Sequence, residues 1–181
     1  MGEQFESVGT ENDGKIRIKL SVFPDNTECN GATKIQLAVR RVSMTAREKS
    51  LVISVSAGTG CYRHLKISDQ ATLEELSDTI LDAFDFINDH AHAFFMNNRP
   101  WTDQDCYYSE LSDEDNEYRH TCDYTLRKIH LHPDQKFVYV FDFGDDWQFR
   151  CRVLKVLEEA TDEPIIVRSK GEPPDQLCPG F

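Results

Sequence analysis

Two kinds of metal-binding side chain flank one predicted turn of the chain. His90 and His92 are two residues apart, and the segment FDFGDDW carries Asp142, Asp145 and Asp146. Imidazole nitrogens and carboxylate oxygens together suit zinc, manganese or iron. A divalent metal held by His90, His92 and Asp145 would activate a water molecule as a nucleophile, so one hypothesis is a metal-dependent hydrolase.

The alternative that we prefer assigns these residues to the fold. Asp145 and Asp146 are of a type that shapes tight turns, because such side chains hydrogen-bond to nearby backbone groups. Asp89 and His90 would end a helix, and His92 would be a hydrogen-bonded, half-buried residue of a strand. On this interpretation the chain has no catalytic residue, and the histidines and aspartates are candidate binding residues only.

Other short matches to functional motifs are not supported by their surroundings. Asp142-Phe143-Gly144 matches the magnesium motif of protein kinases, but neither a Gly-rich loop nor an HRD catalytic loop accompanies it. The glycines at positions 58 and 60 lack the Lys and Ser or Thr of a phosphate-binding loop. The six cysteines are widely spaced and form no CxxC pair. We therefore expect free thiols rather than disulfides or a four-cysteine zinc site.

The elements that must position the candidate residues centre on a predicted β-hairpin around Gly144. Aromatic and β-branched residues alternate over residues 137–142, which is typical of a half-buried strand. After the turn, Trp147 begins an apolar face, whereas Arg150 and Arg152 share the opposite face. Arg150 is a further candidate binding residue, because a cationic strand face can bind an anion or pair with an acidic loop. Trp147 is another candidate as a stacking platform, although a tryptophan in this pattern is more often part of the sheet core.

Similar patterns predict the remaining elements. Alternating apolar residues indicate strands over residues 16–22, 35–42, 51–55, 61–67, 90–96 and 165–167. The main helix is predicted over residues 73–87, where Thr72 and Glu75 form a capping box and apolar residues recur at helical spacing. A short helix is predicted over residues 125–129. The hairpin then lies at the centre of an antiparallel sheet, and the fold class is α+β.

The net charge of −12 is unevenly distributed. Residues 1–70 contain ten Lys and Arg against eight Asp and Glu, whereas residues 71–181 contain ten against twenty-four. Phosphate binding needs clustered cations, so a basic protein partner or a metal ion suits the second part better than nucleic acid. Nucleic-acid binding stays open as an alternative for the N-terminal third. Its cations include Lys15, Arg17, Lys19, Arg40 and Arg41.

The chain shows no membrane or secretion signal. No apolar run approaches the roughly 20 residues that span a bilayer. The N-terminus lacks the basic-then-apolar order of a secretory signal. We therefore expect a cytoplasmic protein.

Four sequence pieces resemble the plasmid pRiA4b Orf3-like family, whose members are also described as TnpR-like passenger proteins of an insertion element. In the family's order they are ATLEEL at residues 71–76, NDHAHAF at 88–94, FDFGDDW at 141–147 and KGEPPDQ at 170–176. The resemblance implies a curved antiparallel sheet packed against the main helix, a link to plasmid or mobile-element biology, and no established activity. The catalytic serine and arginine cluster of a resolvase has no counterpart here.

Together, these observations predict a soluble, non-enzymatic binding or adaptor module with a protein partner. We expect the binding surface on the concave side of the sheet near the hairpin turn, with the acidic loop as a lid. The predicted boundaries are a disordered tail at 1–14, a β extension at 15–49, the family domain at 50–177 with its acidic loop at 97–123, and a C-terminal tail at 178–181.

Overall fold

A computed structural model describes residues 6–11, 14–19, 47–110 and 118–176. The chain divides into two units, residues 1–46 and residues 47–181. In the first unit, β1 (Glu6–Glu11) and β2 (Gly14–Lys19) pair as an antiparallel hairpin.

The N-terminal elements differ in part from the sequence predictions. Residues 6–11 form a strand where a disordered tail was predicted, because backbone hydrogen bonds to β2 do not require apolar side chains. The predicted strand over residues 16–22 is present over its described part, within β2. The strand predicted over residues 35–42 lies outside the described residues.

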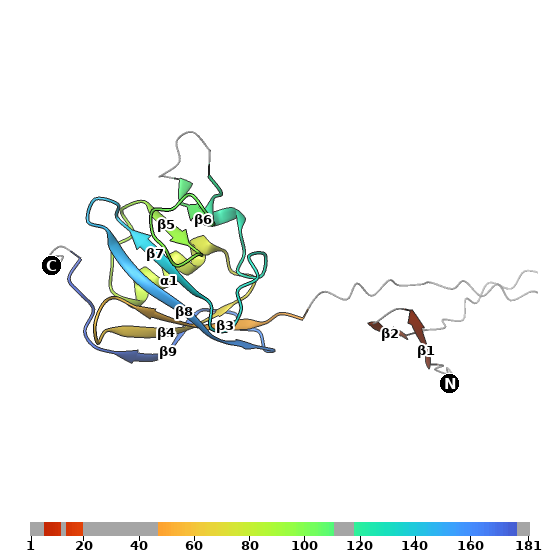
Figure 1. The fold of residues 1–181 in the computed structure, drawn as a ribbon. Coiled ribbons are helices and arrows are strands. Elements are labelled where there is room, and N and C mark those ends of the chain that lie inside the picture. Colours follow the sequence, from red (N-terminus) through yellow and green to blue (C-terminus); the bar gives the residue numbers. More distant parts are fainter. Residues whose placement is uncertain (1–5, 12–13, 20–46, 111–117, 177–181) are drawn as a thin grey trace, which may run out of the picture. The chain divides into compact units, whose positions relative to one another are not determined.

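The second unit is built on an open, seven-stranded antiparallel sheet (Figure 1), which confirms the predicted α+β class. The strand order is β6-β5-β7-β8-β3-β4-β9. The strands are β3 (Ser50–Ser56), β4 (Tyr62–Ser68), β5 (His92–Phe95), β6 (Cys106–Tyr108), β7 (Lys136–Phe141), β8 (Trp147–Leu157) and β9 (Ile165–Lys170). The predicted hairpin around Gly144 joins β7 to β8, in the middle of this order.

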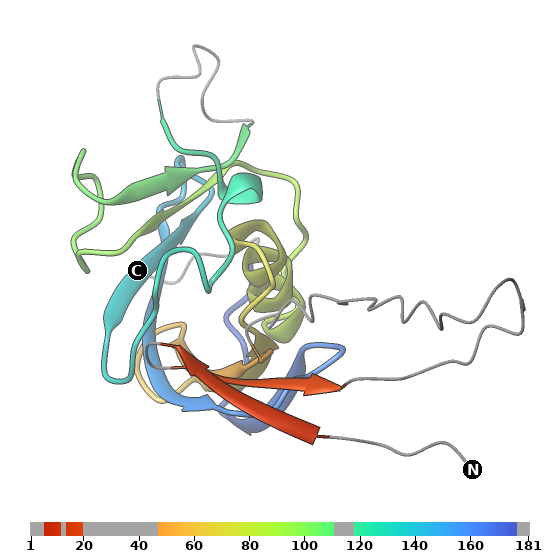
Figure 2. The ribbon, with the colours of Figure 1, turned by 90° about the vertical axis from the view of Figure 1, so that its right-hand side faces the viewer.

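The helix α1 (Leu73–Ala83) covers one face of the sheet, which we call the inner face (Figure 2). Its start is the predicted capping box: the Glu75 backbone N–H donates to Thr72 Oγ1 at 3.1 Å, and the Thr72 N–H donates to Glu75 Oε2 at 2.7 Å. The helical apolar stripe is buried against the strands and includes Leu73, Leu76, Ile80 and Leu81.

The helix ends four residues before the predicted end at Ile87. Asp85 adopts a left-handed conformation with φ 58°, and the Phe86 N–H donates to the Leu81 carbonyl at 3.0 Å. This pattern is a Schellman closure with aspartate in the position that glycine usually occupies. It turns Phe86 into the core against Phe149, whereas Ile87 is 65% exposed.

The two faces of the sheet bury separate apolar clusters. The inner cluster joins α1 to aromatic side chains of the central strands, among them Phe94, Phe137, Tyr139, Phe141 and Phe149. The outer cluster is smaller and comprises Ala93, Phe95, Cys106, Val138 and Val140, with Tyr108 and Phe143 packed against it. The β5–β7 part of the sheet is therefore covered on both faces, which explains why successive residues of β7 are all buried after Lys136.

The region predicted as an acidic loop, residues 97–123, contains regular structure. Strand β6 pairs with β5, and η2 (Thr121–Asp123) is a short 3-10 helix. The helix predicted over residues 125–129 is a turn instead, because Leu126 donates its backbone N–H to Ala71 and Thr125 bridges Thr72. Residues 111–117 lie outside the described part.

The segment after β9 returns to the end of the helix. The Gln176 amide accepts the Ile87 N–H at 2.7 Å and donates to the Ile87 carbonyl at 3.1 Å. Gly171 adopts φ +76°, and a Cβ there would lie 2.6 Å from the Gly60 carbonyl oxygen. These contacts give a structural role to the sequence KGEPPDQ. Within the described residues, no helix is long and apolar enough to cross a bilayer.

Candidate functional site

The hairpin turn is shaped by Asp142, whereas the structural interpretation of the aspartates assigned this role to Asp145 and Asp146. Asp142 adopts φ 51°, and its Oδ1 accepts the Gly144 N–H at 3.0 Å. Its other carboxylate oxygen, Oδ2, lies 3.8 Å from His90 Nε2. Asp142 therefore fixes the backbone of the turn with one oxygen and has a charged or polar neighbour at the other.

The two following aspartates have different surroundings. Asp146 also adopts a left-handed conformation, with φ 52°, and accepts hydrogen bonds from Trp101 Nε1 at 3.1 Å and Gln148 Nε2 at 2.7 Å. Asp145 is exposed, and its carboxylate has no hydrogen bond or ion pair among the described residues. The turn thus presents one carboxylate to solvent and uses the other two to hold the backbone and Trp101.

His90 lies beside this turn at the surface. Its Nδ1 is 2.7 Å from Asp89 Oδ1, and its ring meets the edge of the Phe141 ring. The hydrogen bond that His90 donates to Asp89 raises the pKa of His90, and the charges of Asp142 and Asp145 act in the same direction. Three carboxylates therefore favour the protonated imidazole.

The His92 side chain does not face the hairpin turn and is buried on the inner face of the sheet. It is 2% exposed, and its Nε2 lies 3.3 Å from Glu74 Oε2, close enough for an ion pair but poorly directed for a hydrogen bond. Glu74 also accepts the hydroxyl hydrogen of Thr121. The adjacent His92 imidazole lowers the pKa of Glu74, against the opposing effect of burial. Glu74 was not among the candidate residues of the sequence analysis, so this contact was missed.

The predicted metal ligands therefore have separate partners. His90 faces Asp89 and Asp142, whereas His92 faces Glu74. Across the residues that the structure describes, no three His, Cys, Asp or Glu side chains form a group that would hold a metal ion. Asp145 is near His90, because its charge acts on that imidazole, but the pair lacks a third ligand.

Trp147 belongs to the core side of the sheet. It lies opposite Phe141 in the hairpin, and its ring meets Phe86 edge-on at 5.0 Å between ring centroids. Arg150, by contrast, is exposed on the outer face between Val138 and Ser56. Of these two candidate binding residues, only Arg150 presents its polar group to solvent.

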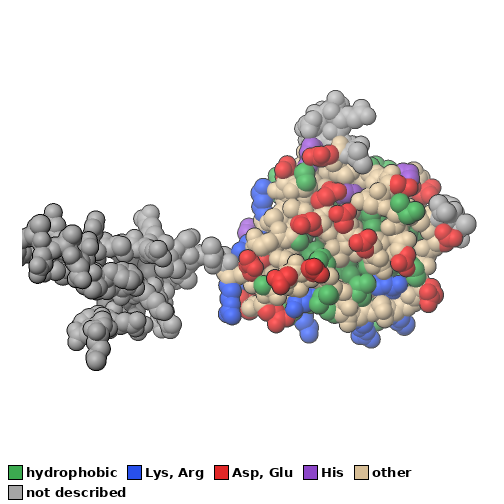
Figure 3. Space-filling view, turned by 180° about the vertical axis from the view of Figure 1, so that it is seen from behind, with side chains coloured by type: hydrophobic (Ala, Val, Ile, Leu, Met, Phe, Trp, Pro, Cys, Tyr) green, Lys and Arg blue, Asp and Glu red, His purple; other side chains and the backbone are tan. Residues whose placement is uncertain are grey.

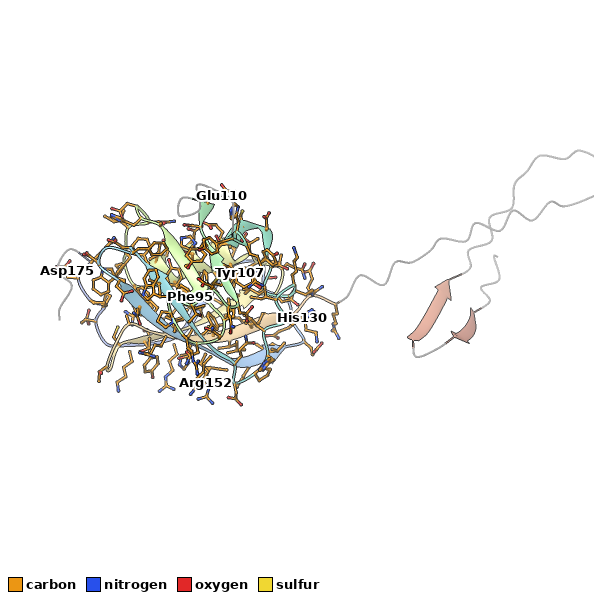
Figure 4. All side chains as sticks on the ribbon, turned by 45° about the horizontal axis from the view of Figure 1, so that its top comes forward. Phe95, Tyr107, Glu110, His130, Arg152 and Asp175 are labelled. Carbon is orange, nitrogen blue, oxygen red and sulfur yellow. The ribbon has the colours of Figure 1, made fainter. Side chains whose placement is uncertain are left out.

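An exposed aromatic side chain lies beside the turn on the outer face. Trp101 is 48% exposed although its ring packs against Phe95 and Phe143, at 5.8 and 5.1 Å between centroids. Phe143 and Phe95 in turn contact Tyr108. Figure 4 labels Phe95 within the sheet, where its buried ring lies beneath the other aromatic rings. Trp101 therefore covers the outer apolar cluster while leaving about half of its own surface to solvent.

Carboxylates surround these rings. Asp146 holds the Trp101 indole, Asp145 is the next residue along the turn, and Asp103 is two residues from Trp101. Burial raises the pKa of Tyr108 to about 12, and the charge of Asp103 contributes to that shift. We call this surface the aromatic–acidic patch and define it as Trp101, Tyr108, Phe143, Asp103, Asp145 and Asp146. A tryptophan within an acidic segment was its only signal in the sequence.

The fold defines an α+β protein in which an open antiparallel sheet carries one helix on its inner face. Residues 54–181 match the family described as plasmid pRiA4b ORF-3-like protein, and the chain belongs to this family, whose function is unknown. A crystal structure described as protein of unknown function MM3350 from Methanosarcina mazei Go1 is similar, with 26% sequence identity and a TM-score of 0.54. The similarity covers 67% of this chain and 70% of that chain. No curated protein shows significant similarity.

Proposed function

We propose that the protein is a non-enzymatic binding module whose aromatic–acidic patch recognises a basic segment of a partner protein. The observation that carries the proposal is the exposed Trp101 ring, held in place among carboxylates. Large apolar side chains that remain exposed beside polar groups are typical of interaction sites.

The patch is preorganised for a cationic side chain. The Trp101 indole is fixed by its hydrogen bond to Asp146 and by edge contact with Phe143. A Lys or Arg side chain over the open part of the indole would gain a cation–π interaction, about 0.5–2 kcal/mol depending on desolvation. Because the ring is already held, little side-chain entropy would be lost on binding.

Charge favours the same partner. The chain carries a net charge of −12, and Asp145 and Asp103 are exposed beside the rings. Carboxylates beside an aromatic face attract cations and repel acidic competitors, which raises the association rate and the specificity. A basic peptide therefore fits both the shape and the charge of the patch. The link to plasmid or mobile-element biology rests on the family alone.

The proposal is tested with a fluorescent Lys- and Arg-rich peptide and the full-length protein, with fluorescence anisotropy as the measure of binding. We expect salt-sensitive binding that Trp101→Ala weakens about twofold to fivefold, the size of an exposed cation–π contact. Trp101→Phe should retain part of the affinity, since it keeps an aromatic face. Ile166→Ala is the matched control, because Ile166 is also an exposed apolar residue but lies on β9.

Two results would contradict the proposal. One is equal binding by the wild type and by Trp101→Ala, with both proteins showing the same cooperative thermal unfolding. The other is a peptide of reversed charge, Glu-rich, binding as well as the basic peptide. In the first case Trp101 would only cover the outer apolar cluster, and in the second the carboxylates would have no role in selection.

A further inference from the structure

The outer face of the sheet changes character between β7 and β8. At β5 and β7 it is apolar and covered, whereas from β8 to β9 it is exposed and basic. We call this second part the cationic face. Its positively charged or titratable residues are His64, Lys66, Arg150, Arg152, Lys155, Arg168 and Lys170. A chain with a net charge of −12 thus collects many of its cations on one surface.

Strand register places these residues in rows across the sheet. The first row, from β8 to β9, is Arg150, Ser56, Tyr62 and Lys170. The second row, in the same direction, is Arg152, Ser54, His64 and Arg168. Neighbouring strands are about 4.8 Å apart, so the cations that end each row are about 14 Å apart, and the rows lie about 7 Å from each other.

The back of the molecule, in the orientation of Figure 1, is mainly acidic. Figure 3, viewed from behind, shows Asp and Glu side chains spread over that side, with Lys and Arg mostly towards its margins, including the lower margin, where Figure 1 places β4 and β9. Figure 4 labels Arg152 at the lower margin, far from Glu110 at the top. The cationic face is therefore a distinct surface and not a part of an evenly mixed one.

Some of these cations have acidic partners and others have none in the described part of the chain. Arg152 pairs with Asp134 at 2.5 Å, and Lys66 pairs with Glu159 at 2.7 Å. Both carboxylates are well exposed, and such surface pairs are weak and exchange readily. Ion pairs among the described residues do not include Arg150, Arg168 or Lys170.

Two stacked rings lie between the unpaired cations. Tyr62 and His64 stack with 4.9 Å between their centroids and 28° between their planes, and the Arg168 guanidinium lies 5.7 Å from the Tyr62 ring centroid. Burial, with a smaller effect from Arg168, lowers the pKa of His64, so the imidazole is neutral at neutral pH. Planar groups flanked by cations form a platform on which a further planar group can stack.

We propose that the cationic face binds single-stranded nucleic acid. Arg150, Arg168 and Lys170 contact phosphates, and a base extends the stack of Tyr62 and His64. An acidic peptide would satisfy the cations but would leave the ring platform unused. Arginine suits this role because its guanidinium donates two hydrogen bonds to one phosphate. This surface is separate from the aromatic–acidic patch and does not depend on it.

The test uses the full-length protein and a fluorescent oligothymidylate of about 12 nucleotides, a length that fits one such face. We expect anisotropy to report binding whose log–log dependence on salt has a slope of about −2, as for three phosphate contacts. The double charge reversal Arg150→Glu with Arg168→Glu should weaken binding at least about tenfold and flatten the slope. Tyr62→Leu should weaken binding about tenfold with the slope unchanged, because it removes stacking and no charge.

The matched control is Arg40→Glu with Arg41→Glu, which makes the same change in net charge within the basic N-terminal third. It should bind within about twofold of the wild type. An equal loss in both double variants would overturn the assignment to the cationic face. So would the absence of salt-sensitive binding by the wild type, or competition by a poly-glutamate peptide as strong as that by the oligonucleotide. If the face variant does not unfold cooperatively, Arg150→Ala with Arg168→Ala replaces it, and unchanged binding by that variant also overturns the proposal.

Discussion

The three carboxylates of the hairpin turn have different roles. Asp142 and Asp146 both adopt positive φ and use their side chains within the molecule. Asp145 lies between them and remains open to solvent. Aspartate tolerates the left-handed region better than most residues, so the turn itself explains aspartate at positions 142 and 146. A metal is not needed to account for these residues.

His90 provides a direct test at this scale. Its pKa is raised above the ordinary value of 6.5, first by the hydrogen bond that it donates to Asp89. A raised pKa in the folded state means that the stabilising contribution is complete below pH 6.5 and is lost as the pH rises through the higher, folded-state value. We expect an NMR titration of the His90 ring to have its midpoint above 6.5, and Asp89→Asn to lower it.

The control for this titration is Asp85→Asn. Asp85 is an exposed carboxylate only five residues before His90, and its charge is not among those that shift the pKa of His90. Its replacement should therefore leave the midpoint unchanged. A midpoint at or below the ordinary value in the wild type would show that the Asp89 contact is absent in solution.

At the scale of elements, the sequence predicted what depends on local periodicity. The hairpin of β7 and β8 and the capped start of α1 are both present, because alternation and a capping box are local signals. The predicted end of α1 was wrong, because an aspartate occupies the left-handed position where glycine is the usual signal.

The side-chain contacts of the candidate site required tertiary information. His92 meets Glu74 because β5 passes beside the first turn of α1, and Trp101 meets Asp146 because the β5–β6 connection crosses the hairpin turn. The partners in each pair are 18 or more residues apart in sequence. No spacing rule connects them, so the sequence alone selected the histidines and aspartates and missed their partners.

The close approach of two connections gives a prediction at the element scale. Gly171, after β9, and Gly60, before β4, both adopt positive φ, at +76° and +84°. A Cβ at Gly171 would meet the Gly60 carbonyl oxygen at 2.6 Å, whereas a Cβ at Gly60 has open space. Gly60→Ala should thus cost only the backbone strain, about 1 kcal/mol, and Gly171→Ala about 3 kcal/mol or more because the backbone must also move.

Chemical denaturation of both variants measures this difference in the free energy of unfolding. Arg63 adds a second consequence, because its guanidinium donates to the carbonyls of Lys170 and Gly171, at 3.1 Å each. A shift of Gly171 should loosen these bonds, so amide exchange should rise at β9 in Gly171→Ala and not in Gly60→Ala. Equal destabilisation by the two substitutions would mean that the connections do not touch.

At the scale of the whole molecule, the two proposed surfaces have opposite charge and lie on different strands. The aromatic–acidic patch lies at the β5–β6 connection and the β7–β8 turn, whereas the cationic face extends over β8, β3, β4 and β9. If a basic partner and a polyanion bound at the same place, their charges would neutralise each other directly. Separate surfaces on one rigid sheet would let a single domain hold both, which is the physical meaning of an adaptor.

Independent surfaces predict independent binding. Trp101→Ala should weaken binding of the basic peptide and leave the affinity for the oligonucleotide within about twofold. Arg150→Glu with Arg168→Glu should weaken binding of the oligonucleotide and leave the affinity for the peptide within about twofold, since distant sites contribute additively.

With the oligonucleotide at saturation, the wild type should still bind the labelled peptide, and the complex should sediment as a ternary species in analytical ultracentrifugation. Displacement of the peptide by the oligonucleotide would show instead that both ligands compete for one surface or for each other. A protein-free mixture of peptide and oligonucleotide at the same salt concentration distinguishes these two cases, because only direct association of the ligands persists without the protein.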